Sequence, residues 1–341
     1  MAEPFKLLLN AELVHLASRH LHRAWPAFDL RHFQGLACEG LDALEFKARA
    51  QHLCAALEAT LPADFDHAAQ ILEAVLRPVG PDTELAALRS NAEGLAGWII
   101  WPMGEYVARR GQGQWPRASR TLHALTQRLT AEFAIRPFLA AEPDAVLETL
   151  ARWTHDPSPH VRRLVSEGSR PRLPWGLRLQ ALVRDPGPTL PLLRALQDDP
   201  SDYVRRSVAN HLNDISKDHP QILVDWLAEH LPQAPAPRRA LLRHASRGLI
   251  KQGHPATLVH WGLGRSFEGR LDWSVAPGLV RIGDSLQLQL RLHSGSQGPQ
   301  ALEIDYVVHH RRANGQTSPK IKLWKIISQA FPAAFKTLPC A

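Results

Sequence analysis

Three acidic residues and one tryptophan in the middle of the chain have side chains suited to one kind of chemistry. The acids are Glu132, Glu167 and Asp214, and the tryptophan is Trp175. Carboxylates stabilise a cationic base and the oxocarbenium-like sugar left when that base departs, and they can orient an attacking water. An indole face adds attraction for a cation. The set therefore indicates cleavage of the bond to a positively charged, alkylated base.

A plainer interpretation of these residues stays open. Asn210 and Asp214 lie four positions apart, so they share one helical face and can equally brace the loops between repeats. Glu132 and Arg136 have the same spacing, which suits an exposed ion pair within one helix. Spacing alone does not choose between a catalytic cluster and local stabilisation.

The segment 165–175, Val-Ser-Glu-Gly-Ser-Arg-Pro-Arg-Leu-Pro-Trp, is the most unusual part of the chain. It indicates a helix that ends near Gly168 and is followed by a polar loop, because two prolines interrupt the helical pattern. A tryptophan in so polar a stretch is hard to explain as ordinary core. Neighbouring helices would then bring the three acids to one concave surface, with Trp175 beside them.

Residues 1–250 read as successive helices, since apolar residues recur at intervals of three and four, as in 11–21 and 41–57. The segment 153–163 returns as 196–206 at an offset of 43, with its Asp-Pro and Val-Arg-Arg kept. A period of about 40–47 residues is typical of HEAT and armadillo repeats. The predicted fold class is therefore mainly α, an α-solenoid of HEAT-like repeats.

The repeated Val-Arg-Arg places arginine pairs at equivalent positions of successive units. Stacking would align them along one edge, where guanidinium groups can meet successive phosphates. The alternative is a scaffold element of the repeat whose arginines are merely solvated.

Charge is divided unevenly along the chain. Residues 1–151 hold 14 Lys/Arg against 18 Asp/Glu, residues 152–251 hold 16 against 10, and residues 252–341 hold 10 against 5. The basic excess of the second half favours a polyanionic partner.

The composition changes near residue 262. Residues 285–293 and 301–310 alternate apolar and polar side chains, and Ala313-Asn-Gly315 is a strong hairpin turn that would pair 318–326 back onto the preceding strand. We expect a small Ig-like β-sandwich of four or five strands, fewer than the seven of a full one. The predicted domains are 1–261 and 262–341, the second incomplete after residue 326.

Several kinds of site and location are disfavoured. There is no Gly-rich phosphate loop, His-Glu-x-x-His, Cys-x-x-Cys or Gly-x-Ser-x-Gly, so we expect no metal and no cofactor. The three cysteines, Cys38, Cys54 and Cys340, do not form a disulfide framework. No run of about 18 apolar residues occurs. We therefore expect a cytoplasmic protein that does not contact membranes.

Four segments resemble one known family. They are 1–6 (MAEPFK), 132–138 (EFAIRPF), 161–175 (VRRLVSEGSRPRLPW) and 203–220 (YVRRSVANHLNDISKDHP). The chain thereby resembles the AlkC branch of the HEAT-like-repeat DNA glycosylases, which is related to AlkD. The resemblance covers about residues 1–325 and includes the Ig-like domain that some AlkC proteins carry, but the expected last strands are replaced by residues 327–341.

The resemblance implies a monofunctional glycosylase that removes 3-methyladenine and 3-methylcytosine from duplex DNA without base flipping. Trp175 would contact the sugar of the damaged nucleotide, and Glu132, Glu167 and Asp214 would supply negative field and position water. We expect a monomer without a cofactor, because a cationic base is already a good leaving group. The candidate DNA-binding residues are Arg162, Arg163, Arg170, Arg172, Arg205, Arg206, Asn210 and Lys217.

Two other functions fit the repeats equally well. One is a non-catalytic HEAT-repeat protein that binds DNA, and the other is a scaffold for protein partners. The acidic residues favour the enzyme, because a pure DNA binder gains nothing from three acids that face a polyanion.

Overall fold

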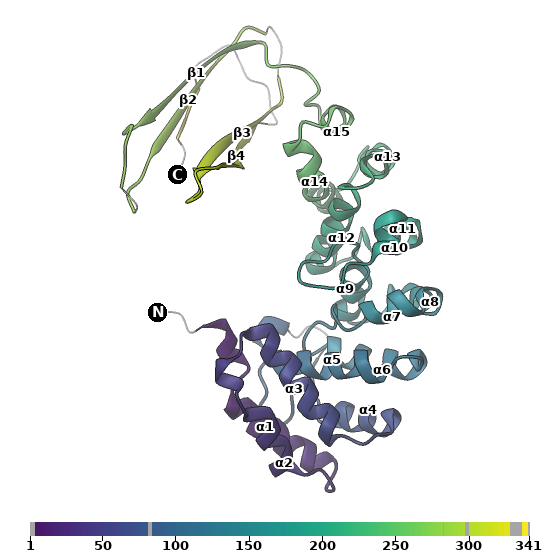
Figure 1. Cartoon of the computed structure of the whole chain (residues 1–341). Coiled ribbons are helices and arrows are strands. Elements are labelled where there is room, and N and C mark those ends of the chain that lie inside the picture. Colours follow the sequence, from purple (N-terminus) through teal and green to yellow (C-terminus); the bar gives the residue numbers. More distant parts are fainter. Residues whose placement is uncertain (1–3, 81–83, 282, 297–299, 328–335, 340–341) are drawn as a thin grey trace. The chain divides into compact units, whose positions relative to one another are not determined.

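The structure is a computed structural model that describes residues 4–80, 84–281, 283–296, 300–327 and 336–339 (Figure 1). Helices occupy the chain up to residue 260, and strands follow, so the predicted fold class is confirmed. The α-helices are α1 Ala11–Ala24, α2 Leu30–Cys38, α3 Phe46–Thr60, α4 Phe65–Ala74, α5 Ile100–Arg110, α6 Trp115–Thr126, α7 Arg136–Ala141, α8 Pro143–Trp153, α9 Pro159–Gly168, α10 Gln180–Arg184, α11 Leu190–Leu196, α12 Asp202–Ile215, α13 Pro220–His230, α14 Ala236–Lys251 and α15 Pro255–His260.

The chain folds into two compact units. Unit 1 comprises Met1–His219 with Pro235–Ala245, and unit 2 comprises Pro220–Ala234 with Ser246–Ala341. The change from helix to strand lies between His260 and Gly269, near the expected change of composition. The units divide the last helices differently, so a functional boundary at residue 262 stays a prediction.

Local sequence explains where many helices of unit 1 begin. Asn10, Asp29 and Asp64 each accept a hydrogen bond from a backbone N–H of the following first turn, at 2.8–2.9 Å. Such caps satisfy donors that the helix itself leaves unpaired. Helices α8 and α9 begin instead at Pro143 and Pro159, where the missing N–H costs nothing.

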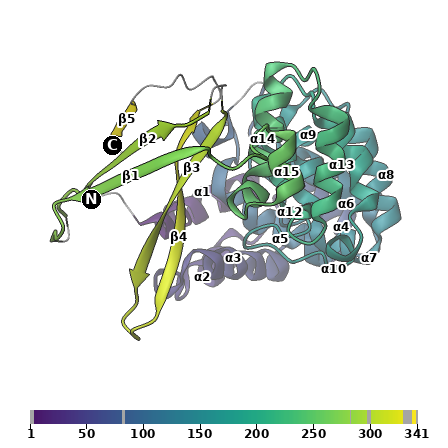
Figure 2. The ribbon, with the colours of Figure 1, turned by 90° about the horizontal axis from the view of Figure 1, so that it is seen from above.

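The helices of unit 1 stack in layers. In Figure 1, α5, α9 and α12 follow one another along one side of the unit, and α4, α6 and α8 along the other. Figure 2, seen from above, shows the same helices largely overlying one another, as expected of a stack. Apolar side chains such as Val107, Leu122, Leu150, Leu164 and Leu212 are fully buried between the layers.

The repeated motif has the same geometry in both copies. Arg162 Nη1 donates to the carbonyls of Asp156 and Pro157 at 2.8 and 3.0 Å. Arg205 Nη1 donates to those of Asp199 and Pro200 at 2.6 and 2.9 Å. The first arginine of each pair therefore closes the loop before its own helix.

Arg162 also joins the two repeats. Its Nε and Nη2 donate to both carboxylate oxygens of Asp199 at 2.6 and 3.0 Å. Asp199 is 6% exposed and belongs to the loop of the next repeat. This bidentate pair ties successive layers together.

The strands form two sheets in unit 2. They are β1 Gly269–Ala276, β2 Gln287–Ser294, β3 Leu302–Arg311, β4 Thr317–Ile327 and β5 Lys336–Pro339. One sheet has the order β1-β2-β5, and the other pairs β3 with β4. The predicted hairpin is confirmed: Gly315 takes a positive φ of 79°, and the strands on either side are antiparallel. Leu290 and Leu292 form the buried centre with Phe267, Leu302 and Ile304 packed against them.

The end of the β domain differs from the expectation. The sequence indicates no strand after residue 326, but β5 pairs antiparallel with β2, with Leu338 opposite Leu290. A strand of four residues is too short for alternation to be visible in the sequence. Residues 328–335 and 340–341, which belong to the same predicted tail, lie outside the described residues.

Candidate active site

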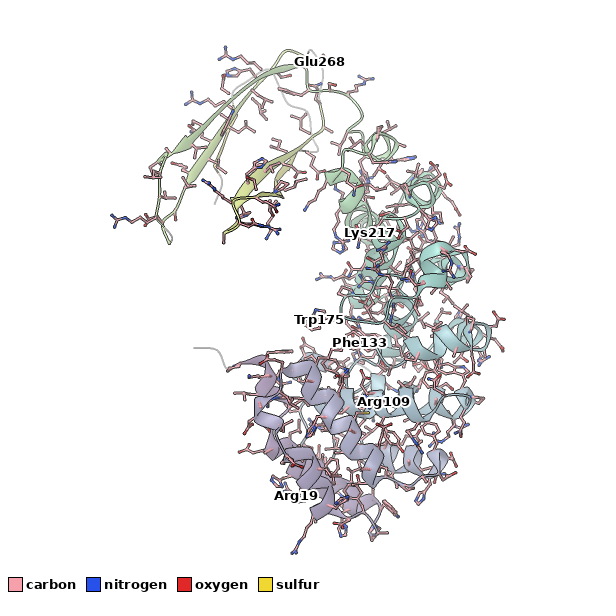
Figure 3. All side chains as sticks on the ribbon, in the orientation of Figure 1. Arg19, Arg109, Phe133, Trp175, Lys217 and Glu268 are labelled. Atoms are coloured by element: carbon pink, nitrogen blue, oxygen red, sulfur yellow. The ribbon has the colours of Figure 1, made fainter. Side chains whose placement is uncertain are left out.

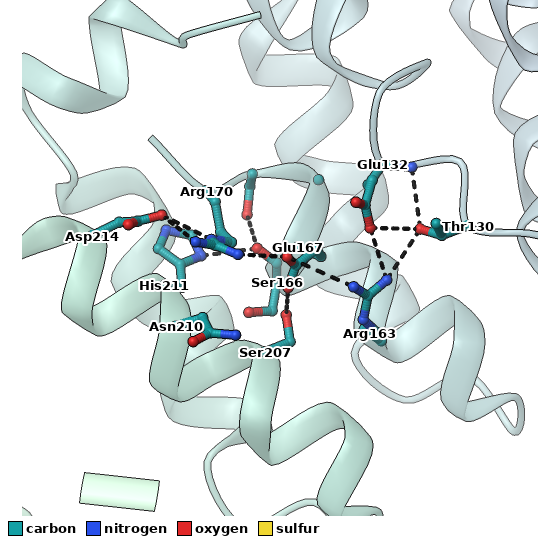
Figure 4. A network of polar contacts seen from close by, with 12 residues as sticks. Thr130, Glu132, Arg163, Ser166, Glu167, Arg170, Ser207, Asn210, His211 and Asp214 are labelled. Atoms are coloured by element: carbon teal, nitrogen blue, oxygen red, sulfur yellow. Dashed lines mark hydrogen bonds and ion pairs between the residues drawn. The ribbon is translucent and has the colours of Figure 1, made fainter. Parts of the chain in front are cut away.

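The three candidate catalytic acids lie in a chain of ion pairs that alternates in charge. Its order is Glu132, Arg163, Glu167, Arg170, Asp214 and Lys217, and Figure 4 shows its course from Glu132 to Asp214. These residues come from the segment before α7, from α9 and the loop after it, and from the end of α12 and the turn that follows it. The structure thus brings together the three acids that the sequence predicts.

Glu132 lies at one end of the chain. Its Oε2 accepts hydrogen bonds from Arg163 Nη1 and from Thr130 Oγ1, both at 2.8 Å. Its side chain is 12% exposed. Among the described residues Oε1 has no hydrogen-bond partner, so this oxygen is available to accept from a bound molecule.

The alternative that Glu132 pairs with Arg136 within one helix is wrong. Glu132 lies in a turn, and α7 begins only at Arg136. Arg136 instead donates to the carbonyls of Gly168 and Leu177. Tertiary partners therefore decide both side chains.

Glu167 is the central acid, and its side chain is 6% exposed. Its Oε1 accepts from Arg170 Nη1 at 2.6 Å, and its Oε2 accepts from Ser207 Oγ on α12 at 2.6 Å. Burial opposes its ionisation, but Arg163 and Arg170 outweigh that effect and hold the pKa of Glu167 below its usual range. The carboxylate is therefore charged at neutral pH.

Asp214 is fully buried, with 1% of its surface exposed. Arg170 Nε donates to its Oδ2 at 2.8 Å, and Lys217 Nζ donates to its Oδ1 at 2.7 Å. His211, one turn earlier on α12, is also buried, and desolvation lowers its pKa to about 4. The neutral His211 ring forms a hydrogen bond to the carbonyl of Ser166 at 2.9 Å.

A pocket of about 320 Å³ opens beside the ion-pair chain. Thr130, Glu132, Glu167 and Arg170 supply its polar wall. The rest of the wall is aromatic and apolar, and includes Trp98, Trp101, Phe133, Leu173 and Trp175. Acids beside aromatic faces are a suitable environment for a positively charged ligand.

Trp175 is the exposed element of the pocket wall. Its side chain is 75% exposed, and its backbone has a φ of 64°, a conformation that costs a non-glycine residue energy. Figure 3 labels it beside Phe133, which lines the same pocket. A large, exposed and strained aromatic residue at a pocket is typical of a functional position.

The candidate DNA-binding residues divide into two groups, which differ in how far other residues of the protein already bind their side chains. Arg163 and Arg170 form ion pairs within the acidic cluster, and Arg162 forms one with Asp199. Carboxylates of neighbouring segments thus neutralise all three guanidinium groups. Arg205 is held by carbonyls of its own loop. These four guanidinium groups are engaged inside the protein.

The remaining candidates are more accessible. The side chains of Arg206 and Lys217 are 72% and 50% exposed. Arg172 pairs with Asp218 at 2.5 Å. The side-chain oxygen of Asn210 lies 2.9 Å from His244 Nε2 of α14. Their contact with DNA stays a prediction.

Sequence reasoning missed several pocket residues. Trp98, Trp101 and Phe133 precede the unusual 165–175 segment by more than 30 residues, and an aromatic side chain in a helical pattern looks like core. In the structure the Trp101 ring contacts both Trp98 and Phe133 in tilted geometry, with centroid distances of 6.3 and 5.5 Å. The one signal in the sequence was the spacing of three positions between Trp98 and Trp101, which places both on one helical face.

Neither a membrane span nor a metal site is found in the described part of the chain. None of its helices is both long and apolar enough to cross a bilayer. No group of three or more His, Cys, Asp or Glu side chains among those residues is arranged to hold a metal ion.

Two families match the chain. Residues 128–249 match a family described as DNA alkylation repair enzyme. Residues 270–333 match the C-terminal Ig-like domain described for the uncharacterised protein YhaZ. The YhaZ protein of Bacillus subtilis (strain 168) is 35% identical over 322 residues, which are 93% of this chain and 84% of the relative.

A solved structure is similar over nearly the whole chain. It is the Pseudomonas fluorescens alkylpurine DNA glycosylase AlkC bound to DNA containing an abasic site analog. The TM-score is 0.86 at 32% identity, and the match covers 98% of this chain and 89% of the other.

Stacked helical repeats, a buried cluster of acids and arginines beside an aromatic pocket, and a small two-sheet domain define a helical-repeat protein of the DNA alkylation repair class. The chain belongs to the AlkC family, with its HEAT-like repeats and C-terminal Ig-like domain.

Proposed function

We propose that this protein is a monofunctional DNA glycosylase that hydrolyses the N-glycosidic bond of 3-methyladenine and 3-methylcytosine in duplex DNA. The observation that carries the proposal is the pocket in which Glu132 and Glu167 face aromatic side chains below the exposed Trp175. Its carboxylates suit a cationic base and a cationic sugar, and it belongs to a chain of the alkylation repair class.

The three acids have different roles in this proposal. Glu132 lines the pocket, and its Oε1 has no hydrogen-bond partner among the described residues, so this oxygen accepts a hydrogen bond from the attacking water. Glu167 also lines the pocket, where its charge stabilises the developing sugar cation. Asp214 is buried and does not line the pocket, so it acts by holding Arg170.

The reaction needs no other chemical group. The bond between C1′ and the base nitrogen breaks, and its electron pair neutralises the charge of the base. Water adds to C1′ on the sugar, and its proton passes to Glu132 and then to solvent. The products are a neutral methylated base and an abasic sugar.

We expect hydrolysis without strand cleavage, because none of the described residues that line the pocket is a lysine that could form a Schiff base with the sugar. Lys217, the lysine of the cluster, is bound to the buried Asp214.

Excision without base flipping is part of the proposal. Trp175 projects to solvent from a loop, where its indole can meet the sugar of a nucleotide that is still stacked. DNA with 2-aminopurine next to the lesion tests this point. Its fluorescence should stay quenched on binding, and a strong increase would show that the base is extruded.

Release of bases is the direct test of the function. Purified protein is incubated with duplex DNA treated with a methylating agent, and the freed bases are separated by chromatography. Release of 3-methyladenine and 3-methylcytosine is expected, with intact abasic strands. No release by folded protein that binds the DNA would favour the non-catalytic DNA-binding alternative, and absence of DNA binding would favour a protein scaffold.

A further inference from the structure

The loop between α9 and α10, residues 169–179, carries Trp175 but has few internal contacts. Within it, Gly176 N donates to the carbonyl of Leu173, and Leu179 N donates to that of Pro171, both at a long 3.3 Å. Trp175 itself keeps a strained backbone while its side chain is 75% exposed. Something outside the loop must therefore hold it, because strain persists only where surrounding contacts fix it.

Arg136 supplies two of those contacts. Its Nε donates to the carbonyl of Leu177 at 2.6 Å, and its Nη1 donates to the carbonyl of Gly168 at 2.7 Å. These carbonyls lie on either side of Trp175, one at the end of α9 and one two residues after the tryptophan. A single rigid guanidinium thus spans the two ends of the loop.

This arrangement is a costly way to stabilise a fold. Arg136 is 0% exposed, and its hydrogen bonds go to carbonyls and not to a carboxylate. Its Nη2 is buried and has no hydrogen-bond partner among the described residues. Desolvation lowers its pKa to about 10, so the group is still a cation at neutral pH. A well-packed apolar residue would often stabilise such a position better than a buried cation.

The packing around Arg136 leaves the loop little freedom. A Cβ added at Gly176 would lie 3.3 Å from Arg136 Cδ and Nε and 3.1 Å from Leu173 Cδ2. A Cβ at Gly168 would lie 2.6 Å from Ile135 Cγ2. Ile135 and Arg136 therefore pack closely against the end of α9 and against the loop beside Trp175, so a side chain at Gly168 needs a shift of Ile135 and one at Gly176 needs a smaller shift of Arg136 or Leu173.

We propose that Arg136 is a positioning residue that fixes the loop 169–179 and so holds Trp175 over the pocket. Its effect on catalysis rests on the proposed function, but its effect on Trp175 does not. Burial of the Arg136 cation costs stability, but it fixes the Trp175 indole in position before a ligand binds.

The test reads the position of Trp175 directly. The full chain is labelled with 5-fluorotryptophan. The ¹⁹F NMR resonance of Trp175 is assigned as the one that is missing in the spectrum of Trp175→Phe. Arg136→Lys removes the fork that spans the two carbonyls while keeping the charge. Arg49→Lys is the matched control. Arg49 is 1% exposed and, like Arg136, donates to backbone carbonyls, in its case those of Leu44, Leu9 and Asp42.

In Arg136→Lys the Trp175 resonance should shift or broaden, and the single-turnover rate of base release should fall by about a hundredfold, because a displacement of about 1 Å has that effect. Affinity for undamaged DNA should stay within about twofold, since the phosphate contacts that supply it are untouched. Arg49→Lys should lower stability, but its folded molecules should keep the Trp175 resonance and the rate of base release of the wild-type protein.

Gly176→Ala tests the same contact from the loop side and covers the case in which Arg136→Lys does not fold. It should also move the Trp175 resonance. An unchanged resonance in every folded variant of this pair, or an equal change in Arg49→Lys, overturns the proposal. If the wild-type protein releases no base, the proposed function fails, and the resonance still decides the role of Arg136.

Discussion

At the scale of single residues, the three acids of the cluster are not equivalent. Among the described residues, Glu132 Oε1 has no hydrogen-bond partner, whereas both oxygens of Glu167 and of Asp214 have protein partners. Neutralising Asp214 leaves the charge of Arg170 less compensated in a buried place, which destabilises the fold. Glu132 is therefore the residue at which chemistry and stability are best separated.

We predict that Glu132→Gln lowers the single-turnover rate of base release by about 10²–10³-fold, the usual effect of removing one preorganised electrostatic group. Dissociation constants for DNA should change little, because the substituted side chain is 12% exposed and faces the pocket. Glu148→Gln is the control, since Glu148 is 75% exposed and its one ion pair among the described residues is with Arg152 on the same helix. Near wild-type release by Glu132→Gln would contradict the assignment.

Trp175 gives a second prediction, which separates strain from function. Trp175→Ala keeps a Cβ at a φ of 64°, whereas Trp175→Gly removes it. The free energy of unfolding of the glycine variant should therefore be about 1 kcal/mol higher than that of the alanine variant. Both should lose base release to the same extent, because both lack the indole. Denaturant unfolding and single-turnover assays check the pair. Retained release in either variant would remove Trp175 from the active site.

Stability should fall in acid in two separate ranges. The pKa of His211 is lowered by burial to about 4, so the unfolded chain takes up this proton first, below about pH 6.5. As the pH falls from about 6.5 to 4, the free energy of unfolding therefore decreases by about 3 kcal/mol because of His211. The pKa of Glu167 is also lowered, so its contribution is present above the unfolded value of about 4.3 and is lost below it.

Urea unfolding of the wild-type protein and of His211→Gln at pH 7, 6 and 5 measures this effect. The wild-type free energy of unfolding should decrease more steeply than that of the variant over this interval. Parallel decreases would mean that His211 titrates normally in the folded protein.

At the scale of helices and loops, the repeat is held by its arginines as well as by apolar packing. The first arginine of each Val-Arg-Arg closes its own loop, and Arg162 also binds the aspartate of the next loop. The motif that looks like a row of phosphate contacts is thus used, at these positions, to join repeats.

We predict that Arg162→Ala lowers the free energy of unfolding by about 3–5 kcal/mol, since it leaves the buried Asp199 without its cation. The exposed pair of Arg152 and Glu148 is the comparison, and Arg152→Ala should cost less than about 1 kcal/mol. Chemical denaturation of both variants is the measurement. Equal losses would show that the link between repeats adds nothing beyond an ordinary surface pair.

At the scale of the whole molecule, the charge that is left for DNA differs from the raw count. The second half of the chain has most of the basic excess, but several of its arginines are neutralised internally. Arg206 is the best remaining candidate, because its side chain is 72% exposed and, in the part of the chain that the structure describes, pairs with the exposed Asp202 alone, at 3.4 Å.

Replacing Arg206 with Ala should weaken binding to any DNA sequence and reduce the slope of log K against log salt by about 0.9. Arg205→Ala, its neighbour, should leave that slope unchanged, because its Nη1 is held by the carbonyls of Asp199 and Pro200. Fluorescence anisotropy titrations over a range of salt concentrations distinguish the two. The reverse result would place Arg205 on the DNA.

The sequence by itself determined the class of fold, the 43-residue repeat and the strands of the hairpin, because helical periodicity, alternation and turn residues are local properties. It also identified the three acids and Trp175. Only the tertiary structure decided which cations neutralise those acids, which oxygen stays free, and that Arg136 holds the Trp175 loop. These contacts join residues 31–44 positions apart in different helices and loops, and no local pattern carries such pairing.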